Sequence, residues 1–199
     1  MKKRTAIEKR KTRETDITVK LTIGGSGKAK IDTGIGFLDH MLELFAFWGF
    51  FDLEIKTGKC DLKVDIHHTN EDIGIVLGKA FNTALGNKKG ITRIGFASVP
   101  MEETIGDVTV DINGRGFFML NGVTSANKSE GYELEYAKHF FDEFAKHLGM
   151  NLNIRVNNPS ADLHATLEPV FKALGIAMDR ATQIDPRRKG IPSTKGVID

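Results

Sequence analysis

The chain has 199 residues, of which 40% are hydrophobic and 27% charged, a composition typical of a globular protein. Lys and Arg total 28 against 26 Asp and Glu, a net charge of +2 that argues against a nucleic-acid or membrane-surface partner. The single cysteine, Cys60, excludes an internal disulfide framework and fits a reducing compartment. No apolar run follows the basic start and none is long enough to span a bilayer, so we expect a cytoplasmic protein.

The first half of the chain alternates strand and helix patterns. Alternating apolar and polar residues predict strands at 17–23, 28–32 and 52–56, with a short fourth strand at 61–65. The glycine-rich stretch 24–27 predicts a turn that joins the first two strands as a hairpin. We expect an apolar helix at 37–48, ended by Gly49, and a second helix that starts at a histidine pair and ends at Gly86.

The second half predicts a similar series. Strands are expected at 91–100, 107–112, 117–120 and 151–156. The first should stop at Pro100, and the turn 113–116 should make the second and third strands a hairpin. Helices are expected at 133–148, ended by Gly149, and at about 162–181.

The two halves therefore have the same order of elements: hairpin, helix ended by glycine, strand, loop, and a helix with a histidine at its start. Residues 47–55 and 147–154 occupy the same place in this order, about a hundred residues apart. We infer an internal duplication. Residues 1–90 form the first repeat and residues 91–199 the second, and each repeat carries one candidate metal-ligand helix. The second repeat also carries a basic C-terminal tail.

Histidine and glutamate at helical spacing mark both of these helices. His67 and Glu71 are four residues apart, as are His164 and Glu168, so each pair shares one helix face. An imidazole and a carboxylate on one face are half of a divalent metal site. His68 points about a third of a turn away from His67, which suggests two metal ions, one for each histidine.

His40 and His139 extend this pattern, because each lies in the first helix of its repeat. The competing interpretations are capping or surface histidines for the pairs, and satisfied core residues for the two single histidines. Recurrence in equivalent places of two repeats favours metal ligands.

Several longer motifs resemble the imidazoleglycerol-phosphate dehydratase family of histidine biosynthesis. The matching segments run in order along nearly the whole chain: 33–42, 67–72, 90–95, 111–115, 168–173 and 185–197. The resemblance implies a duplicated α/β (α+β) fold in which two four-stranded sheets enclose the helices. It implies dehydration of imidazole glycerol phosphate to imidazole acetol phosphate. It also implies a site with two divalent metals, manganese in this family, built between the subunits of a large homo-oligomer of about 24 copies.

The resemblance also implies residue roles. One metal would take His67, Glu71 and His139, and the other would take His40, His68, His164 and Glu168. Glu168 would move protons and Glu14 would be an acidic substrate contact. The residues implied at the phosphate end or in other substrate contacts are Arg93, Arg115, Lys172, Ser193 and Lys195.

The chain departs from the family pattern at four positions where polar groups are usual: Leu44, Trp48, Ile66 and Ala165. Ala165 stands where a second histidine is usual in the second repeat. Two other functions therefore stay open. The chain could be a non-catalytic homologue held together by metal, or a metal-dependent hydrolase of phosphate esters.

Overall fold

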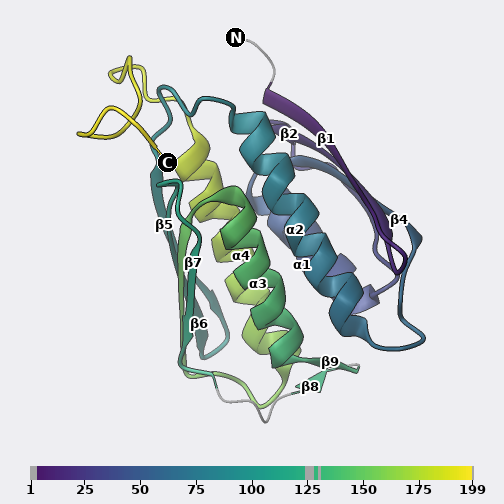
Figure 1. Cartoon of the computed structure of the whole chain (residues 1–199). Helices are drawn as coiled ribbons and strands as arrows, with labels where there is room; N and C mark the ends of the chain where they lie inside the picture. The colour runs from purple at the N-terminus through teal and green to yellow at the C-terminus, as the bar shows by residue number, and fades with distance from the viewer. Residues whose placement is uncertain (1–3, 124–127, 130, 199) are drawn as a thin grey trace.

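The computed structural model describes residues 4–123, 128–129 and 131–198, and it contains two four-stranded sheets with four helices between them (Figure 1). The first repeat contains β1 Arg4–Lys11, β2 Asp16–Ile23, β3 Ala29–Asp32, α1 Gly36–Trp48, β4 Asp52–Lys59 and α2 Ile66–Leu85. The second contains β5 Ile94–Met101, β6 Thr104–Asp111, β7 Phe117–Asn121, β8 Lys128–Ser129, β9 Tyr132–Glu133, α3 Leu134–Leu148, β10 Asn151–Asn157 and α4 Leu163–Thr182.

The two large sheets have equivalent strand orders, β1-β2-β4-β3 and β5-β6-β10-β7. In each sheet the repeat's first two strands form an antiparallel hairpin, and the third strand pairs in parallel with the fourth. This equivalence supports the predicted duplication, and the predicted fold class is confirmed. The proposed boundary between residues 90 and 91 stays a prediction, since the buried side chains of both repeats form one continuous core.

Both predicted hairpins within these sheets are wrong. The turn at 24–27 does not pair β2 with β3, because β4 lies between them, and β7 likewise pairs with β10 rather than with β6. The hairpin partner of β2 is β1, which the sequence pattern did not reveal because only Ala6 of that strand is buried. Alternation identifies a strand, whereas its partner depends on the whole sheet.

Two smaller predictions are also corrected. Residues 61–65 form a turn rather than a strand, closed by backbone bonds from Val64 N (3.0 Å) and Asp65 N (3.2 Å) to Asp61 O. The strand predicted to stop at Pro100 runs on to Met101. Because β5 is an edge strand, it tolerates a residue that lacks an N–H donor.

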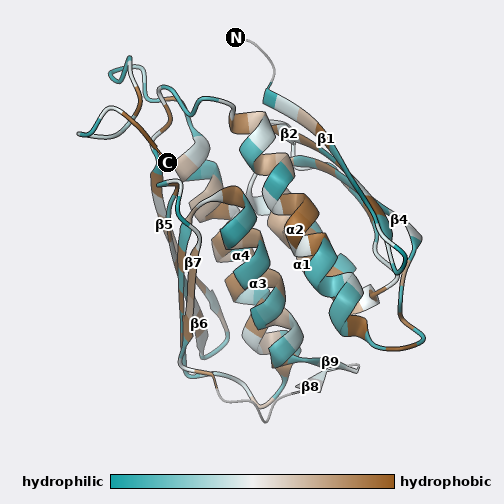
Figure 2. Ribbon diagram, viewed as in Figure 1, coloured by the Kyte–Doolittle hydropathy of each residue, from teal (hydrophilic) through white to brown (hydrophobic). Residues whose placement is uncertain are grey.

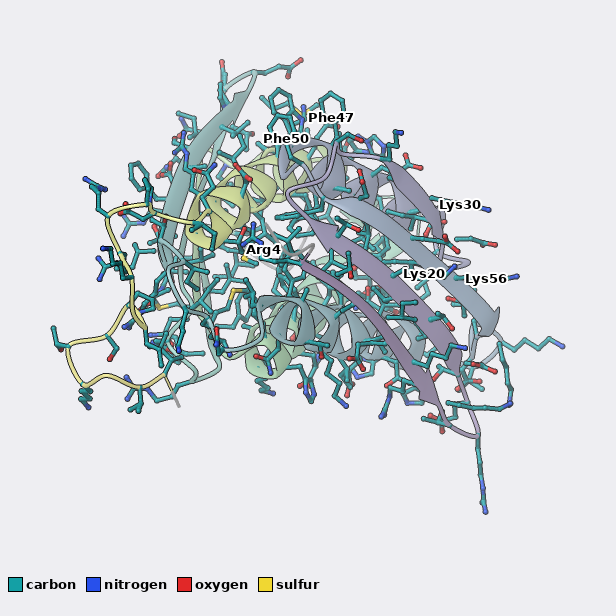
Figure 3. All side chains as sticks on the ribbon, turned by 90° about the horizontal axis from the view of Figure 1, so that it is seen from above. Arg4, Lys20, Lys30, Phe47, Phe50 and Lys56 are labelled. Carbon is teal, nitrogen blue, oxygen red and sulfur yellow. The ribbon has the colours of Figure 1, made fainter. Side chains whose placement is uncertain are left out.

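The helices form a middle layer between the inner faces of the sheets. Helix α2 packs on β1 and β2 and against α3, while α4 packs on β5 and β6 and against α1. Figure 2 shows hydrophilic residues along β1 and β4 and on the exposed sides of α2 and α3, whereas the second sheet also exposes apolar residues such as Phe96 and Phe117. In Figure 3 the outer face of the first sheet carries Lys20, Lys30 and Lys56, and Lys20 pairs with Glu54 at 2.9 Å. Among the described residues, no helix is long and apolar enough to cross a membrane.

Helices α2 and α4 begin in the same way. Asp65 and Asp162 are their N-cap residues, and each carboxylate accepts a hydrogen bond from the backbone N–H two residues later, at 3.2 and 3.0 Å. Such a bond satisfies one of the free donors of a helix start. The two helices are therefore in the same register, in which His67 corresponds to His164 and His68 to Ala165.

A tyrosine network holds the helix starts together at one end of the layer. Tyr132 is fully buried, and its hydroxyl donates to Asn70 Oδ1 at 2.6 Å. Asn70 Nδ2 donates in turn to Tyr136 O at 2.6 Å, and the Tyr132 ring stacks on Phe37 with centroids 4.6 Å apart. Burial raises the pKa of Tyr132, so this hydroxyl stays a neutral donor. The network joins the N-terminal turns of α1, α2 and α3.

Close packing of α2 on α3 at Gly78 provides a first test. An added Cβ at Gly78 would lie 2.8 Å from Phe144 O and 3.0 Å from Leu148 N. These backbone atoms cannot move cheaply, and overpacking of this kind costs about 1–3 kcal/mol. We expect Gly78→Ala to lower the free energy of unfolding measured by urea denaturation, despite the ~1 kcal/mol that alanine gains in helix propensity.

Gly36→Ala is the matched control, because an added Cβ at that first residue of α1 meets nothing within 4 Å. Its free energy of unfolding should be unchanged or slightly higher. If both variants lost stability equally, close helix packing would not be the reason for glycine at position 78.

Candidate active site

The first cluster joins the starts of α1 and α4. His40, His164 and Glu168 each offer a ligand atom, and these atoms lie within 4.8 Å of one another. Glu168 Oε2 is 3.0 Å from His164 Nε2 and 3.5 Å from His40 Nε2, and the two imidazole rings stack at 5.1 Å. All three residues are half-buried. Two nitrogens and one carboxylate oxygen around a shared space are a donor set that divalent metals use.

The carboxylate of this cluster is shared with Lys172. Lys172 Nζ lies 2.6 Å from Glu168 Oε1, which leaves Oε2 directed at the two histidines. Burial acts to raise the pKa of Glu168, but the hydrogen bond and charge of Lys172, with the bonds from His164 and His40, outweigh it. The net result is a lowered pKa, so Glu168 is a carboxylate at neutral pH.

The second cluster joins the starts of α2 and α3. His67 Nε2 lies 3.1 Å from Glu71 Oε2, and the His67 ring is 4.3 Å from the His139 ring, centroid to centroid. The structure therefore places His67 beside each of the other two residues that were expected to share one metal with it.

His68 lies apart from the cluster in which it was expected. Within the chain its Nδ1 is 3.0 Å from Asp61 Oδ2 and 3.8 Å from Glu14 Oε2, and its ligand atoms do not join His40, His164 and Glu168. The hydrogen bond to Asp61 raises the pKa of His68, and the charge of Glu14 acts in the same direction. Because the resemblance assigns the metal sites to subunit boundaries, a shared ion for His68 and His40 stays a prediction that needs a second copy.

Glu14 is positioned by the turn between β1 and β2. Thr12 Oγ1 accepts hydrogen bonds from the backbone N–H groups of Glu14 at 3.0 Å and Thr15 at 2.9 Å. Buried Asp72 then attaches this turn to α2, because it accepts from Thr15 Oγ1 at 2.5 Å and from Arg10 Nε at 2.6 Å. These bonds hold the exposed carboxylate of Glu14 beside His68.

Besides Glu14, five residues were expected to contact phosphate or substrate, and four of these five line one polar cavity of about 210 Å³. Its lining residues are Arg93, Asn113, Arg115, Ser193, Thr194, Lys195 and Val197. Lys172 does not line it, since that side chain is committed to Glu168. Guanidinium and ammonium donors converging on a small cavity favour an anion such as a phosphate group.

Arg93 also has a structural role. Its guanidinium donates two hydrogen bonds to Asp111, at 2.6 and 2.9 Å, and one to Pro192 O at 2.9 Å. The bond to Asp111 raises the pKa of Arg93, so its charge is permanent. Arg93 thus anchors the C-terminal tail, which carries Ser193 and Lys195, to the end of β6.

The anion cavity and the histidine clusters lie at opposite ends of the folded molecule. Arg93 N donates to Ala181 O at 2.8 Å, near the C-terminus of α4, whereas His164 is in the first turn of that helix. A helix of 20 residues is about 30 Å long. Figure 1 shows the C-terminal segment at the end of the molecule remote from β8 and β9. One small ligand cannot reach both places within a single chain.

The departures from the family pattern are not equally close to the histidines. Ala165 takes the place in α4 that His68 takes in α2, and Leu44 is one helical turn from His40. Trp48 is eight residues from His40, or about 12 Å along α1, and its side chain is exposed, like its neighbour Phe47. Trp48 therefore does not touch the cluster of its own chain.

Sequence reasoning missed Asp61 and Asn113. Asn113 was assigned only to a turn, although its Oδ1 accepts from Arg115 N at 2.9 Å and its side chain lines the cavity. Asp61 was assigned to a strand, and the only available signal was a carboxylate a few residues before the histidine pair.

Comparison with known proteins identifies the family. The fold and site define a duplicated α+β protein with histidine–carboxylate clusters at one end and an anion cavity at the other. The family model described as imidazoleglycerol-phosphate dehydratase matches residues 33–178. The chain belongs to this family, whose members are dehydratases and hence hydro-lyases, and the resemblance inferred from its motifs is confirmed.

Individual relatives agree over nearly the full length. Imidazoleglycerol-phosphate dehydratase of Pelobacter propionicus is 48% identical over 98% of this chain and 99% of its own. The Methanocella arvoryzae protein of the same name is 49% identical over 98% of this chain and its full length. The crystal structure of IGPD from Pyrococcus furiosus matches this chain with a TM-score of 0.81 and 35% sequence identity. The match covers 95% of this chain and 99% of the Pyrococcus furiosus chain.

Two substitutions in the anion cavity should both weaken phosphate binding but differ in their effect on stability. Arg93→Ala removes the paired bonds to Asp111 and the anchor to Pro192, so it should lower both phosphate affinity and thermal stability. Hydrogen bonds to charged groups contribute about 1.5–3 kcal/mol each. Lys195 is exposed, so Lys195→Ala should weaken binding of inorganic phosphate with little change in stability. Calorimetry and thermal melts measure both quantities.

Arg93 would then serve both folding and binding, and Lys195 binding alone. Equal losses of stability in the two variants would contradict the anchoring role of Arg93, and unchanged phosphate affinity in both would contradict the anion cavity.

Proposed function

We propose that this protein dehydrates imidazole glycerol phosphate to imidazole acetol phosphate in histidine biosynthesis, with two divalent metal ions in each active site. The observation that carries the proposal is the combination of a full-length family match with the cluster of His40, His164 and Glu168, the contacts of His67 with Glu71 and His139, and a separate anion cavity. The single cysteine and the biosynthetic role are consistent with a cytoplasmic enzyme.

The donor sets fit metal ions. In the first cluster, three ligand atoms lie within 4.8 Å of one another around one space, and two of them are imidazole nitrogens. Mixed nitrogen and oxygen donors suit manganese, iron and zinc alike, so manganese is favoured by the family resemblance alone. When bound, the ions would polarise the substrate's imidazole and stabilise negative charge on it.

The chain's own residues would do the remaining work. Arg115, Ser193 and Lys195 would hold the phosphate, with Arg93 keeping the tail in place. Glu168 is ionised because of Lys172, which suits it to accept the proton lost from the substrate carbon. It would then deliver that proton to the departing hydroxyl, which leaves as water. Glu14 would contact the substrate from the turn beside His68.

This chemistry requires a homo-oligomer. The anion cavity and the histidine clusters of one chain are separated by the length of α4, about 30 Å. This distance is longer than a small phosphorylated imidazole. We infer that the cavity of one subunit completes the clusters of another, in keeping with the large assembly expected from the family. The exposed apolar side chains Phe47, Trp48 and Phe50 at the end of α1 are suited to subunit contact (Figure 3 labels Phe47 and Phe50).

A product assay tests the reaction. Purified protein with Mn²⁺ and imidazole glycerol phosphate should yield imidazole acetol phosphate, followed by proton NMR. Release of inorganic phosphate instead would indicate a hydrolase, and no product with a fully metal-loaded assembly would indicate a non-catalytic homologue.

Removal of Glu168's charge should affect catalysis more than stability. Loss of a positioned acid or base typically costs 10²–10⁴-fold in rate, so we expect a decrease in kcat of that order for Glu168→Gln. Glu143→Gln is the matched control, because Glu143 also pairs with a histidine one turn away, His147 at 3.4 Å, but lies outside both clusters. Turnover of the control should stay near wild type. Equal effects of the two substitutions would contradict the role assigned to Glu168.

Metal removal should reduce the size of the particle. If the ions bridge subunits, chelation leaves facing imidazoles and carboxylates unpaired at the interface and weakens association. Light scattering after exhaustive dialysis against a chelator should therefore give a lower molar mass, restored by Mn²⁺. An unchanged mass in a preparation shown to be metal-free would mean that the ions do not hold the assembly together.

A further inference from the structure

Asp61 is a carboxylate beside the active-site residues to which no role has been assigned. It lies in the turn between β4 and α2, and its Oδ2 is 3.0 Å from Nδ1 of His68. Because a carboxylate only accepts hydrogen bonds, this contact requires the proton of the imidazole on Nδ1. In the neutral ring, the lone pair is then on Nε2, at the other side of the ring.

This pairing differs from that of the other candidate ligands. His67, His164 and His40 each direct Nε2 at a carboxylate that is itself a candidate ligand of the same ion. His68 instead uses Nδ1, so its Nε2 remains available while the contact with Asp61 is kept. A ligating histidine that donates its second nitrogen to a carboxylate has a fixed tautomer, a fixed ring orientation and increased basicity.

The backbone of Asp61 is held independently of its side chain. Its N–H donates to Oγ1 of buried Thr69 at 3.0 Å, and its carbonyl accepts from Val64 N and Asp65 N. Thr69 follows His68 in α2, so the turn and the helix start are joined at the point where the ring is oriented. Removal of the carboxylate should leave these backbone bonds intact.

We propose that Asp61 is a positioning residue that holds His68 in the Nδ1–H tautomer with Nε2 presented to a metal ion. The inference rests on the proposed metal-dependent function and adds to it a residue that touches neither the ion nor the substrate. The second repeat has no counterpart of this pair, because Ala165 occupies the position equivalent to His68.

Two measurements on Asp61→Ala test the proposal. In metal-free protein labelled with ¹⁵N-histidine, the His68 signals, assigned by their loss in His68→Ala, should show a protonated Nδ1 in wild type and a tautomer mixture in the variant. In calorimetric titration with Mn²⁺, the variant should lose 10–100-fold in affinity at one class of site. The double variant Asp61→Ala/His68→Ala should bind no more weakly than His68→Ala alone.

Asp52→Ala is the control, because Asp52 also holds a turn, accepting from Ser26 N at 2.8 Å, but touches no histidine. It should leave the His68 signals and the Mn²⁺ affinity unchanged. An unchanged tautomer in Asp61→Ala, or a loss of affinity no greater than in Asp52→Ala, would overturn the inference. So would a crystal structure of the Mn²⁺-loaded protein in which an Asp61 oxygen is bonded to the ion.

The failure of the proposed function would look different. Wild-type protein that takes up no Mn²⁺ at all would overturn the metal-dependent reaction itself, before any variant is compared.

Discussion

The structure depends on one packing constraint: two amphipathic sheets must each cover an apolar face, and they use the same layer of helices to do so. Each long helix, α2 or α4, packs on its own sheet and also against the shorter helix of the other repeat. Neither repeat could bury its sheet face alone, which is why the buried side chains form one core. The arrangement also directs the N-termini of the helices to the same end, where the tyrosine network joins them.

The candidate metal ligands meet because the N-termini of the helices lie at the same end of the molecule. His40 reaches His164, and His67 reaches His139, only because each pair sits in the first turns of helices from different repeats. The anion cavity forms at the opposite end, where the tail folds back onto Arg93. Under the proposed function, the candidate ligands at one end and the anion cavity at the other could serve one substrate only where two copies of the chain meet.

The carboxylates near the histidines differ in the nitrogen of the imidazole ring that they contact. Glu168 is held by Lys172 and lies at Nε2 of two histidines, whereas Glu71 lies at Nε2 of His67. Asp61 lies at Nδ1 of His68. Under the proposed role of Asp61, this difference in ring nitrogen separates carboxylates that would share an ion with a histidine from a carboxylate that would orient one. Residue type alone does not make this distinction.

The sequence by itself determined the duplication, the helices and most of the candidate residues, because these depend on local spacing. Four-residue intervals bring His67 to Glu71 and His164 to Glu168 in any helix, and the capping aspartates start both helices at the same place. Only the tertiary structure decided which strands pair, since β4 separates β2 from β3 and no turn signal reports that insertion. It also decided that, within one chain, His68 meets Asp61 and Glu14 rather than His40, and that Lys172 meets Glu168 rather than the anion cavity. These contacts depend on how a loop or a neighbouring helix packs, and that depends on the whole core rather than on any one segment.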